Sequence, residues 1–144
     1  MRVAAGYAGI MAVEHSIMGD LTKNFNRSEF ACKGANCCGH SAPVSLELVE
    51  GLQFLRDMAK VPLLITSGFR CNKHNSTMKP PGAKNSQHIY GTAADIATPK
   101  GWAAKELYDL AESLMLFDGI GIYDWGVHVD VRGTKARWDH RKSK

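Results

Sequence analysis

Residues 86–95 read Ser86-Gln87-His88-Ile89-Tyr90-Gly91-Thr92-Ala93-Ala94-Asp95 and place an imidazole and a carboxylate seven residues apart. A second short stretch, 126–131, reads Gly-Val-His-Val-Asp-Val and adds His128. Two imidazoles and one carboxylate are the ligand set of a catalytic zinc site, in which the fourth position is left for water. His88, Asp95 and His128 are therefore candidate ligands for Zn²⁺.

The stretch 126–131 also has a second interpretation. Valines alternate with His128 and Asp130, so the two polar side chains share one face of a strand. A half-buried strand with a polar outer face has the same pattern, and a single histidine on such a strand is more often a core residue than a ligand. Spacing alone leaves metal ligation and a structural histidine both open.

The surrounding pattern predicts an α+β fold. Apolar residues at helical spacing predict a helix that follows an N-cap at Ser45 and ends near Lys60. A second helix is expected after Thr98-Pro99, with proline at its first position. Strands are expected at 63–66, 88–98 (broken at Gly91), 119–123 and 127–131, with a hairpin across 124–126 and a surface loop at 71–85. This order is not a regular βαβ alternation and predicts a single domain with a small antiparallel sheet flanked by helices.

Length and composition exclude several classes of protein. The chain has 144 residues, which is the size of about one domain, and 44% hydrophobic with 22% charged residues argues against disorder. No run approaches the roughly 18 apolar residues of a membrane span. The net charge of +4 suits an anionic polymer such as nucleic acid or bacterial cell wall, although a solvated surface is the commoner meaning. There is no basic stripe with interleaved aromatic residues, so we expect no nucleic-acid partner.

Both ends of the chain are expected to lie outside the organised domain. Arg2 followed by apolar residues 3–13 resembles a secretory signal only weakly, because Met-Ala-Val at 11–13 is a poor match to an A-x-A cleavage site. We expect residues 1–20 to be a peripheral extension, 21–138 to form the domain and 139–144 to be a basic tail. Without a clear signal peptide, we expect synthesis in a bacterial cytoplasm.

The chain has four cysteines, Cys32, Cys37, Cys38 and Cys71, which form no C-x-x-C pair and are too few for a disulfide scaffold. Cys71-Asn-Lys-His74 is a C-x-x-H pattern that could join the cysteines at 32–38 in a second, structural zinc site. A Cys32–Cys71 disulfide and free thiols are the alternatives, and free thiols are favoured for a protein made in a cytoplasm.

The pattern Ser-x-His-x-x-Gly-x-Ala-x-Asp at 86–95, followed by a strand histidine, is similar to that of peptidase family M15. This family contains zinc D-Ala-D-Ala carboxypeptidases and endopeptidases and shares its fold with the Hedgehog signalling domain. Three other segments fit in order: 25–30 with Cys32, Ser-Gly-Phe-Arg at 67–70, and the hairpin region 119–132. The resemblance spans roughly residues 21–138 and implies a Hedgehog-like DD-peptidase fold.

The resemblance also implies roles for individual residues. His88, Asp95 and His128 would be the zinc ligands, and Arg70 would bind a substrate carbonyl or carboxylate and stabilise the oxyanion, although a surface salt bridge is its simpler interpretation. Many members of the family place Glu, Asp or His a few residues before the last histidine ligand, but the residue three before His128 is Trp125, which cannot take a proton. We expect Asp124 to be the base, or else a plain turn residue, and Asp130 to be a partner of a ligand or an alternative base.

The implied function is that of a zinc metallopeptidase that hydrolyses a peptide bond in the stem peptide or cross-link of bacterial peptidoglycan. Small single-domain enzymes of this kind resemble phage endolysins, and we expect a monomer. The alternative is a non-catalytic, zinc-containing domain of the same fold that binds cell wall or protein. The bond cut would depend on loops 71–85 and 132–144, in which the sequence has no recognisable pattern.

Overall fold

The computed structural model describes residues 19–142. Helix α2 (Leu46–Ala59) begins as predicted after Ser45, whose Oγ accepts a hydrogen bond from the Leu48 N–H at 3.3 Å. It ends where Lys60 adopts a left-handed conformation with φ of 61°. The apolar face of α2 is fully buried and supplies much of the core, through Leu48, Val49, Leu52 and Leu55.

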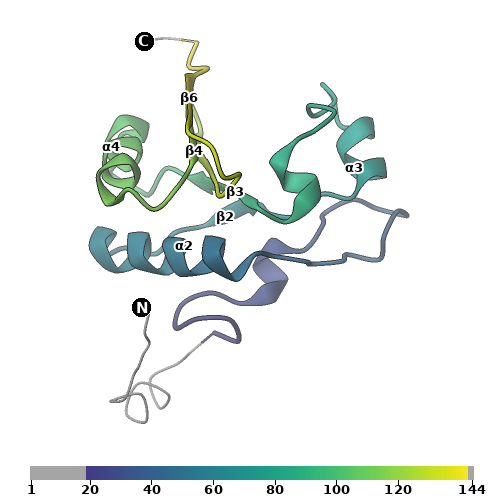
Figure 1. Ribbon diagram of the computed structural model, residues 1–144, viewed down its shortest axis with the longest axis horizontal. Helices are drawn as coiled ribbons and strands as arrows, with labels where there is room; N and C mark the ends of the chain where they lie inside the picture. Colours follow the sequence, from purple (N-terminus) through teal and green to yellow (C-terminus); the bar gives the residue numbers. More distant parts are fainter. Residues whose placement is uncertain (1–18, 143–144) are drawn as a thin grey trace.

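Five strands form one sheet, in the order β2-β3-β5-β4-β6 (Figure 1). Neighbouring strands are antiparallel except β4 and β6, which run parallel. This sheet and its helices confirm the predicted α+β class, whereas the parallel edge strand was not predicted. The strands are β2 (Ile65–Ser67), β3 (Ala93–Ala97), β4 (Gly119–Tyr123), β5 (Gly126–Asp130) and β6 (Ala136–Asp139).

Three local predictions were wrong. Residues 88–98 are not one broken strand, because the 3₁₀ turn η2 (Gln87–Tyr90) precedes β3 and Gly91 separates them at φ of 72°. The second helix, α4 (Ala104–Leu114), does not start at Pro99, because Gly101 takes a left-handed φ of 84° that interrupts the turn. The predicted loop 71–85 contains the short helix α3 (Asn72–Thr77).

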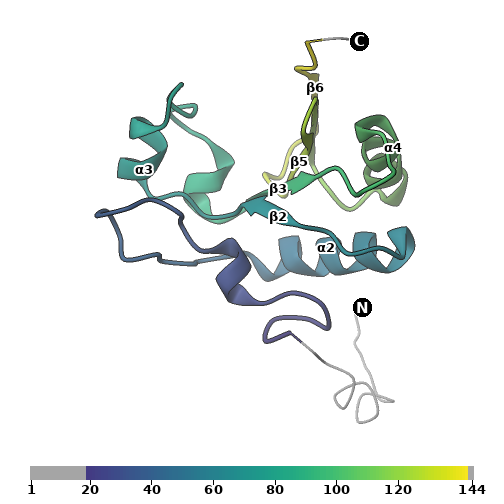
Figure 2. The same ribbon diagram turned by 180° about the vertical axis from the view of Figure 1, so that it is seen from behind.

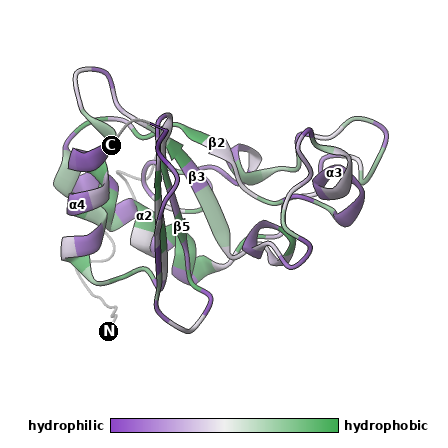
Figure 3. Cartoon of the chain, turned by 90° about the horizontal axis from the view of Figure 1, so that it is seen from above, coloured by the Kyte–Doolittle hydropathy of each residue, from purple (hydrophilic) through white to green (hydrophobic). Residues whose placement is uncertain are grey.

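The two faces of the sheet carry different residues. Figure 3 shows α2 and α4 on one side of the sheet and α3 on the other. Toward α2 and α4 the strands present large apolar side chains, all nearly or fully buried: Ile96, Ile120, Ile122, Val127 and Val129. Because side chains alternate along a strand, the opposite face carries the positions between them, which include Asp95, His128 and Asp130. The apolar face therefore anchors the sheet to the helices, and the polar face is left for a site.

The predicted domain limits, 21 and 138, lie near the two ends of the described residues. The predicted extension 1–20 lies outside the described residues up to Met18, and the 3₁₀ turn η1 (Arg27–Phe30) is the first named element after it. At the other end β6 reaches Asp139, whose carboxylate pairs with Arg141 at 2.7 Å. Within residues 19–142 no helix has the length and apolar character that crossing a membrane requires.

Candidate active site

Strand register and one 3₁₀ turn place the three predicted ligands. Asp95 of β3 lies directly opposite His128 of β5 in the antiparallel ladder. His88 lies in η2, which starts where Ser86 Oγ accepts a hydrogen bond from the His88 N–H at 3.2 Å. Gly91 ends this turn so close to Pro43 that a Cβ would stand 2.6 Å from the Pro43 carbonyl oxygen. The turn therefore requires glycine there, and it returns the chain to β3 with His88 beside Asp95.

The structure brings the three side chains together around one carboxylate oxygen. His88 Nε2 lies 3.2 Å and His128 Nδ1 lies 3.1 Å from Asp95 Oδ1. All three residues are more than 90% buried. Their ligand atoms form a group of the size that one metal ion bridges. The sequence left metal ligation and a structural role for the histidine both open. The position of the three side chains in the structure makes them a candidate metal centre.

The donor set fits a zinc ion. For a tetrahedral ion bound at 2.0–2.1 Å, the ligand atoms should lie about 3.3 Å apart, close to the two distances observed. The outer nitrogens of both rings are already bonded: His88 Nδ1–H donates to the Gly68 carbonyl, and His128 Nε2–H donates to Asp130 Oδ2, each at 2.7 Å. Such partners fix the tautomer so that the inner nitrogen of each ring presents a lone pair toward Asp95 Oδ1.

The electrostatics of the centre favour ionised carboxylates. Burial by itself would raise the pKa of Asp95, but hydrogen bonds and charge from His128 and His88 outweigh it and hold that pKa well below its usual range. Burial likewise opposes protonation of His128, yet its hydrogen bonds to Asp130 and Asp95 raise its pKa. Metal binding requires the neutral ring, so a bound cation would compete with protonation of His128.

Arg70 lies against the centre, next to Asp95. Its Nη2 lies 3.2 Å from Asp95 Oδ2, the oxygen that faces away from the two imidazoles. Its Nε donates to Ser67 Oγ at 3.0 Å and its Nη1 to Asn75 Oδ1 at 3.4 Å. Three of the five guanidinium N–H groups are thereby used, which leaves two for a further acceptor.

Among residues 19–142, Asp130 is joined to the centre through His128. It is fully buried, and each of its oxygens accepts hydrogen bonds from Arg132: Oδ1 from the backbone N–H and Nε, Oδ2 from Nη2. Hydrogen bonds from His128 and Arg132 overcome the effect of burial and lower the pKa of Asp130. The Asp-x-Arg pattern at 130–132 is the sequence signal for this pairing, which sequence reasoning missed.

Asp124 lies apart from these residues. It is exposed in the β4–β5 turn, and its Oδ2 accepts a hydrogen bond from the Lys142 N–H at 3.2 Å. Across residues 19–142, no hydrogen bond or ion pair joins Asp124 to His88, Asp95 or His128. Of the two predicted acidic residues, Asp130 thus contacts a ligand and Asp124 stands free of the centre.

A tryptophan forms one wall of the site. Trp138 of β6 lies opposite Gly121, and its ring centroid is 5.1 Å from that of His128. Its Nε1–H donates to the Tyr123 hydroxyl at 2.8 Å, and the Arg132 guanidinium lies 5.3 Å from its ring. Sequence reasoning missed Trp138 because β6 has no alternating apolar pattern.

Two buried imidazoles and one carboxylate lie together on the polar face of an α+β sheet. This is the ligand set of a metal-dependent hydrolase. A family model described as Peptidase M15 matches residues 23–131, and the chain therefore belongs to the peptidase M15 family. This confirms the resemblance found in the sequence and makes the chain a metallopeptidase by family, in which zinc dependence is typical. No curated protein matches the chain significantly.

Proposed function

We propose that this protein is a zinc metallopeptidase that hydrolyses a peptide bond in the stem peptide or cross-link of bacterial peptidoglycan, in the manner of an endolysin. The observation that carries the proposal is the convergence of His88, Asp95 and His128, with both rings oriented by outer hydrogen bonds, in a chain of the M15 family. The net charge of +4 would favour approach to an anionic wall.

The three side chains would hold Zn²⁺ through His88 Nε2, Asp95 Oδ1 and His128 Nδ1. Zinc in such a site supplies Lewis acidity, which polarises a carbonyl and activates water near neutral pH. The protein contributes the orientation: Gly68 and Asp130 fix the two rings, and Arg70 fixes the second oxygen of Asp95.

Arg70 is our candidate for the group that binds the substrate. Its side chain is about 13% exposed, and it retains two unused N–H donors beside the Asp95 carboxylate. A planar, permanently charged guanidinium binds a carbonyl oxygen that gains negative charge during hydrolysis, and also a terminal carboxylate. This position would align the scissile carbonyl with the metal centre.

The reaction also needs a proton acceptor within hydrogen-bond distance of the attacking water, directly or through one water. We assign this role to Asp124, because both oxygens of Asp130 are already hydrogen bonded inside the protein. Among the described residues Asp124 contacts none of the three ligands, so it would have to act through an intervening water. Asp124 uses one oxygen for the Lys142 N–H and keeps the other for solvent or substrate. Asp130 acts instead as a positioning residue for His128.

The separation of Asp124 from the metal ligands favours one alternative function. A domain without a base at the centre would hold zinc and bind a wall or protein ligand without cutting it. Purified peptidoglycans of different chemotypes, incubated with zinc-loaded protein and analysed by mass spectrometry, distinguish the two functions. We expect defined peptide fragments that disappear in the matched His88→Ala variant. Intact polymer with every chemotype, at full zinc occupancy, would favour the binding domain.

A further inference from the structure

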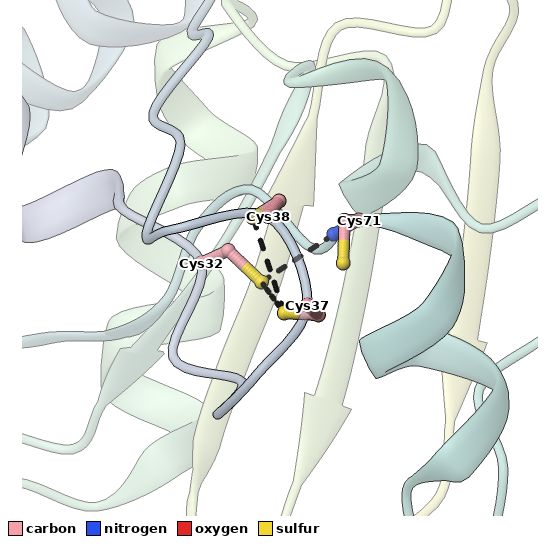
Figure 4. Close-up of side chains that lie close together, drawn as sticks. All are labelled: Cys32, Cys37, Cys38 and Cys71. Carbon is pink, nitrogen blue, oxygen red and sulfur yellow. Dashed lines mark hydrogen bonds between the residues drawn. The ribbon is translucent and has the colours of Figure 1, made fainter.

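All four cysteines of the chain meet at a second place, away from the candidate active site. Cys32, Cys37 and Cys38 lie in the segment 31–45, which has no helix or strand, and Cys71 directly precedes α3. Figure 4 shows the four cysteine side chains gathered between these two segments. Each of the four sulfurs lies within 4.8 Å of the other three.

The sulfur–sulfur distances suit a metal ion and exclude disulfides in this arrangement. Cys32 Sγ lies 3.9 Å from Cys37 Sγ, which lies 4.0 Å from Cys38 Sγ. A tetrahedral zinc ion bound at 2.3 Å places its sulfurs about 3.8 Å apart, whereas a disulfide needs about 2.05 Å. The cysteines are free, and a spacing of this size has room for one ion at its centre.

Backbone N–H groups point at three of the four sulfurs. Cys71 N–H donates to Cys32 Sγ at 3.5 Å, Ser41 N–H to Cys38 Sγ at 3.4 Å, and His74 N–H to Cys71 Sγ at 3.4 Å. Such bonds orient sulfur ligands and stabilise their charged form, as partners of metal ligands do. The cluster is thus built by the backbone and does not result from four side chains meeting by chance on a surface.

The loop that holds three of the cysteines packs closely against α3. The Cys32 N–H donates to the Ser41 carbonyl at 2.8 Å, which closes the loop that returns Cys37 and Cys38 toward Cys32. Gly34 lies within this loop, and a Cβ there would stand 2.8 Å from both Cys37 Sγ and the His74 side chain. Lys73 Nζ donates to the Asn36 carbonyl at 2.9 Å and so joins α3 to the loop.

We propose that Cys32, Cys37, Cys38 and Cys71 bind one structural Zn²⁺ ion, distinct from the ion of the His88–Asp95–His128 centre. Four sulfur ligands leave no open position, as in structural zinc sites, and soft thiolates favour zinc over hard cations such as Mg²⁺ or Ca²⁺. The C-x-x-H pattern noted in the sequence contributes Cys71 to this site, while the backbone of His74 supplies a hydrogen bond.

The ion would stabilise the segment that supplies Gly68 and Arg70 to the candidate active site. Figures 1 and 2 show the segment 31–45 beside α3 in opposite views. Cys71 follows Arg70, and the Phe69 N–H donates to the Phe30 carbonyl at 2.8 Å, two residues before Cys32. The same short segment supplies Gly68, whose carbonyl orients His88. Zinc would therefore hold the irregular segment 31–45 against the residues after β2, which include Arg70.

Metal analysis of the full-length protein tests this proposal independently of activity. We expect two zinc ions per chain, and one in the His88→Ala/His128→Ala variant. Replacing zinc by Co²⁺ in that variant should produce a thiolate-to-cobalt absorption band in the near ultraviolet. Because the chain has only four cysteines, all in the cluster, such a band can come from no other sulfur. Absence of metal and band from the folded double variant would overturn the proposal.

Cysteine variants and alkylation complete the test. Cys37→Ser and Cys38→Ser should each lose one zinc ion, whereas Ser76→Ala, an exposed position on α3, should keep both. If the cysteine variants fail to fold, alkylation of the unmodified protein decides. We expect the thiols to react at least tenfold more slowly with zinc than after chelation. Equal rates in both conditions, or disulfides in the intact mass of the non-reduced protein, would contradict the site.

Discussion

Asp130 and His128 occupy alternate positions on the same face of β5, and Asp130 Oδ2 accepts a hydrogen bond from His128 Nε2 at 2.7 Å. This bond leaves Nδ1 of the ring to face Asp95. A buried carboxylate two residues beyond a histidine ligand thus decides which nitrogen can bind metal. The second imidazole is oriented by the Gly68 carbonyl, so the two rings are held by different kinds of acceptor.

The Asp130→Asn variant should lower zinc affinity at the His88–Asp95–His128 centre by about 10–100-fold. An amide retains the shape of the side chain but loses the charge that orients the ring and strengthens its basicity. Competition with a chromophoric chelator measures the affinity, and thermal unfolding reports whether the fold survives. Asp109→Asn, which changes an exposed carboxylate on α4, is the matched control. Unchanged affinity in folded Asp130→Asn would argue against the positioning role.

The Arg70→Lys variant should lower kcat by about 10²–10³-fold and leave the zinc content unchanged. Lysine keeps the positive charge but cannot bond Ser67, Asp95 and a substrate oxygen in one plane. Fragment release from peptidoglycan, measured beside metal content, separates the two effects. Arg27→Lys, whose guanidinium bonds the Ala42 carbonyl outside the site, should retain full activity. A loss of zinc with unchanged turnover per bound ion would instead show that Arg70 positions Asp95 for metal binding and does not bind the substrate.

The Asp124→Asn variant tests the assigned base. Removing a general base typically costs about 10²–10⁴-fold in rate, so we expect a loss of that size with normal zinc binding. The amide can still accept the Lys142 hydrogen bond, which keeps the turn intact. Asp109→Asn again serves as the control for removal of one surface charge. Full activity of Asp124→Asn would show that the base lies elsewhere.

The sequence predicts those features of the structure that depend on residues close together along the chain. Helix α2 followed from Ser45 and the apolar spacing after it, and the β4–β5 hairpin from two apolar runs around a turn. The types of His88, Asp95 and His128 suggested a metal site before their positions were known. Those signals all lie within a few residues of one another or in the chemistry of single side chains.

Features that depend on distant partners were not predictable. Strand β6 has the residues Ala-Arg-Trp-Asp, without an apolar alternation, and it forms because β4 offers a parallel edge. The role of Asp130 depended on which nitrogen of His128 faces Asp95, and the strand register decides that. The absence of a bond between Asp124 and the three candidate ligands, among the described residues, likewise depends on how the β4–β5 turn folds.

The packing of Trp138 beside His128 depends on the absence of a side chain at Gly121, the residue opposite Trp138 on β4. A Cβ at Gly121 would overlap the indole ring of Trp138, which stands beside His128. Gly121→Ala should therefore destabilise the protein by about 1–3 kcal/mol, since a rigid ring in a packed position cannot yield without strain.

The double variant isolates this contact. In a Trp138→Ala background the ring is gone, and Gly121→Ala should cost less than about 0.5 kcal/mol, because alanine is the better strand residue once space is open. Urea unfolding of the four proteins gives the coupling energy. Equal costs of Gly121→Ala in both backgrounds would mean that the strain lies in the β4 backbone. A large coupling would instead establish that the missing side chain at Gly121 leaves the space in which Trp138 packs against His128, the proposed metal ligand.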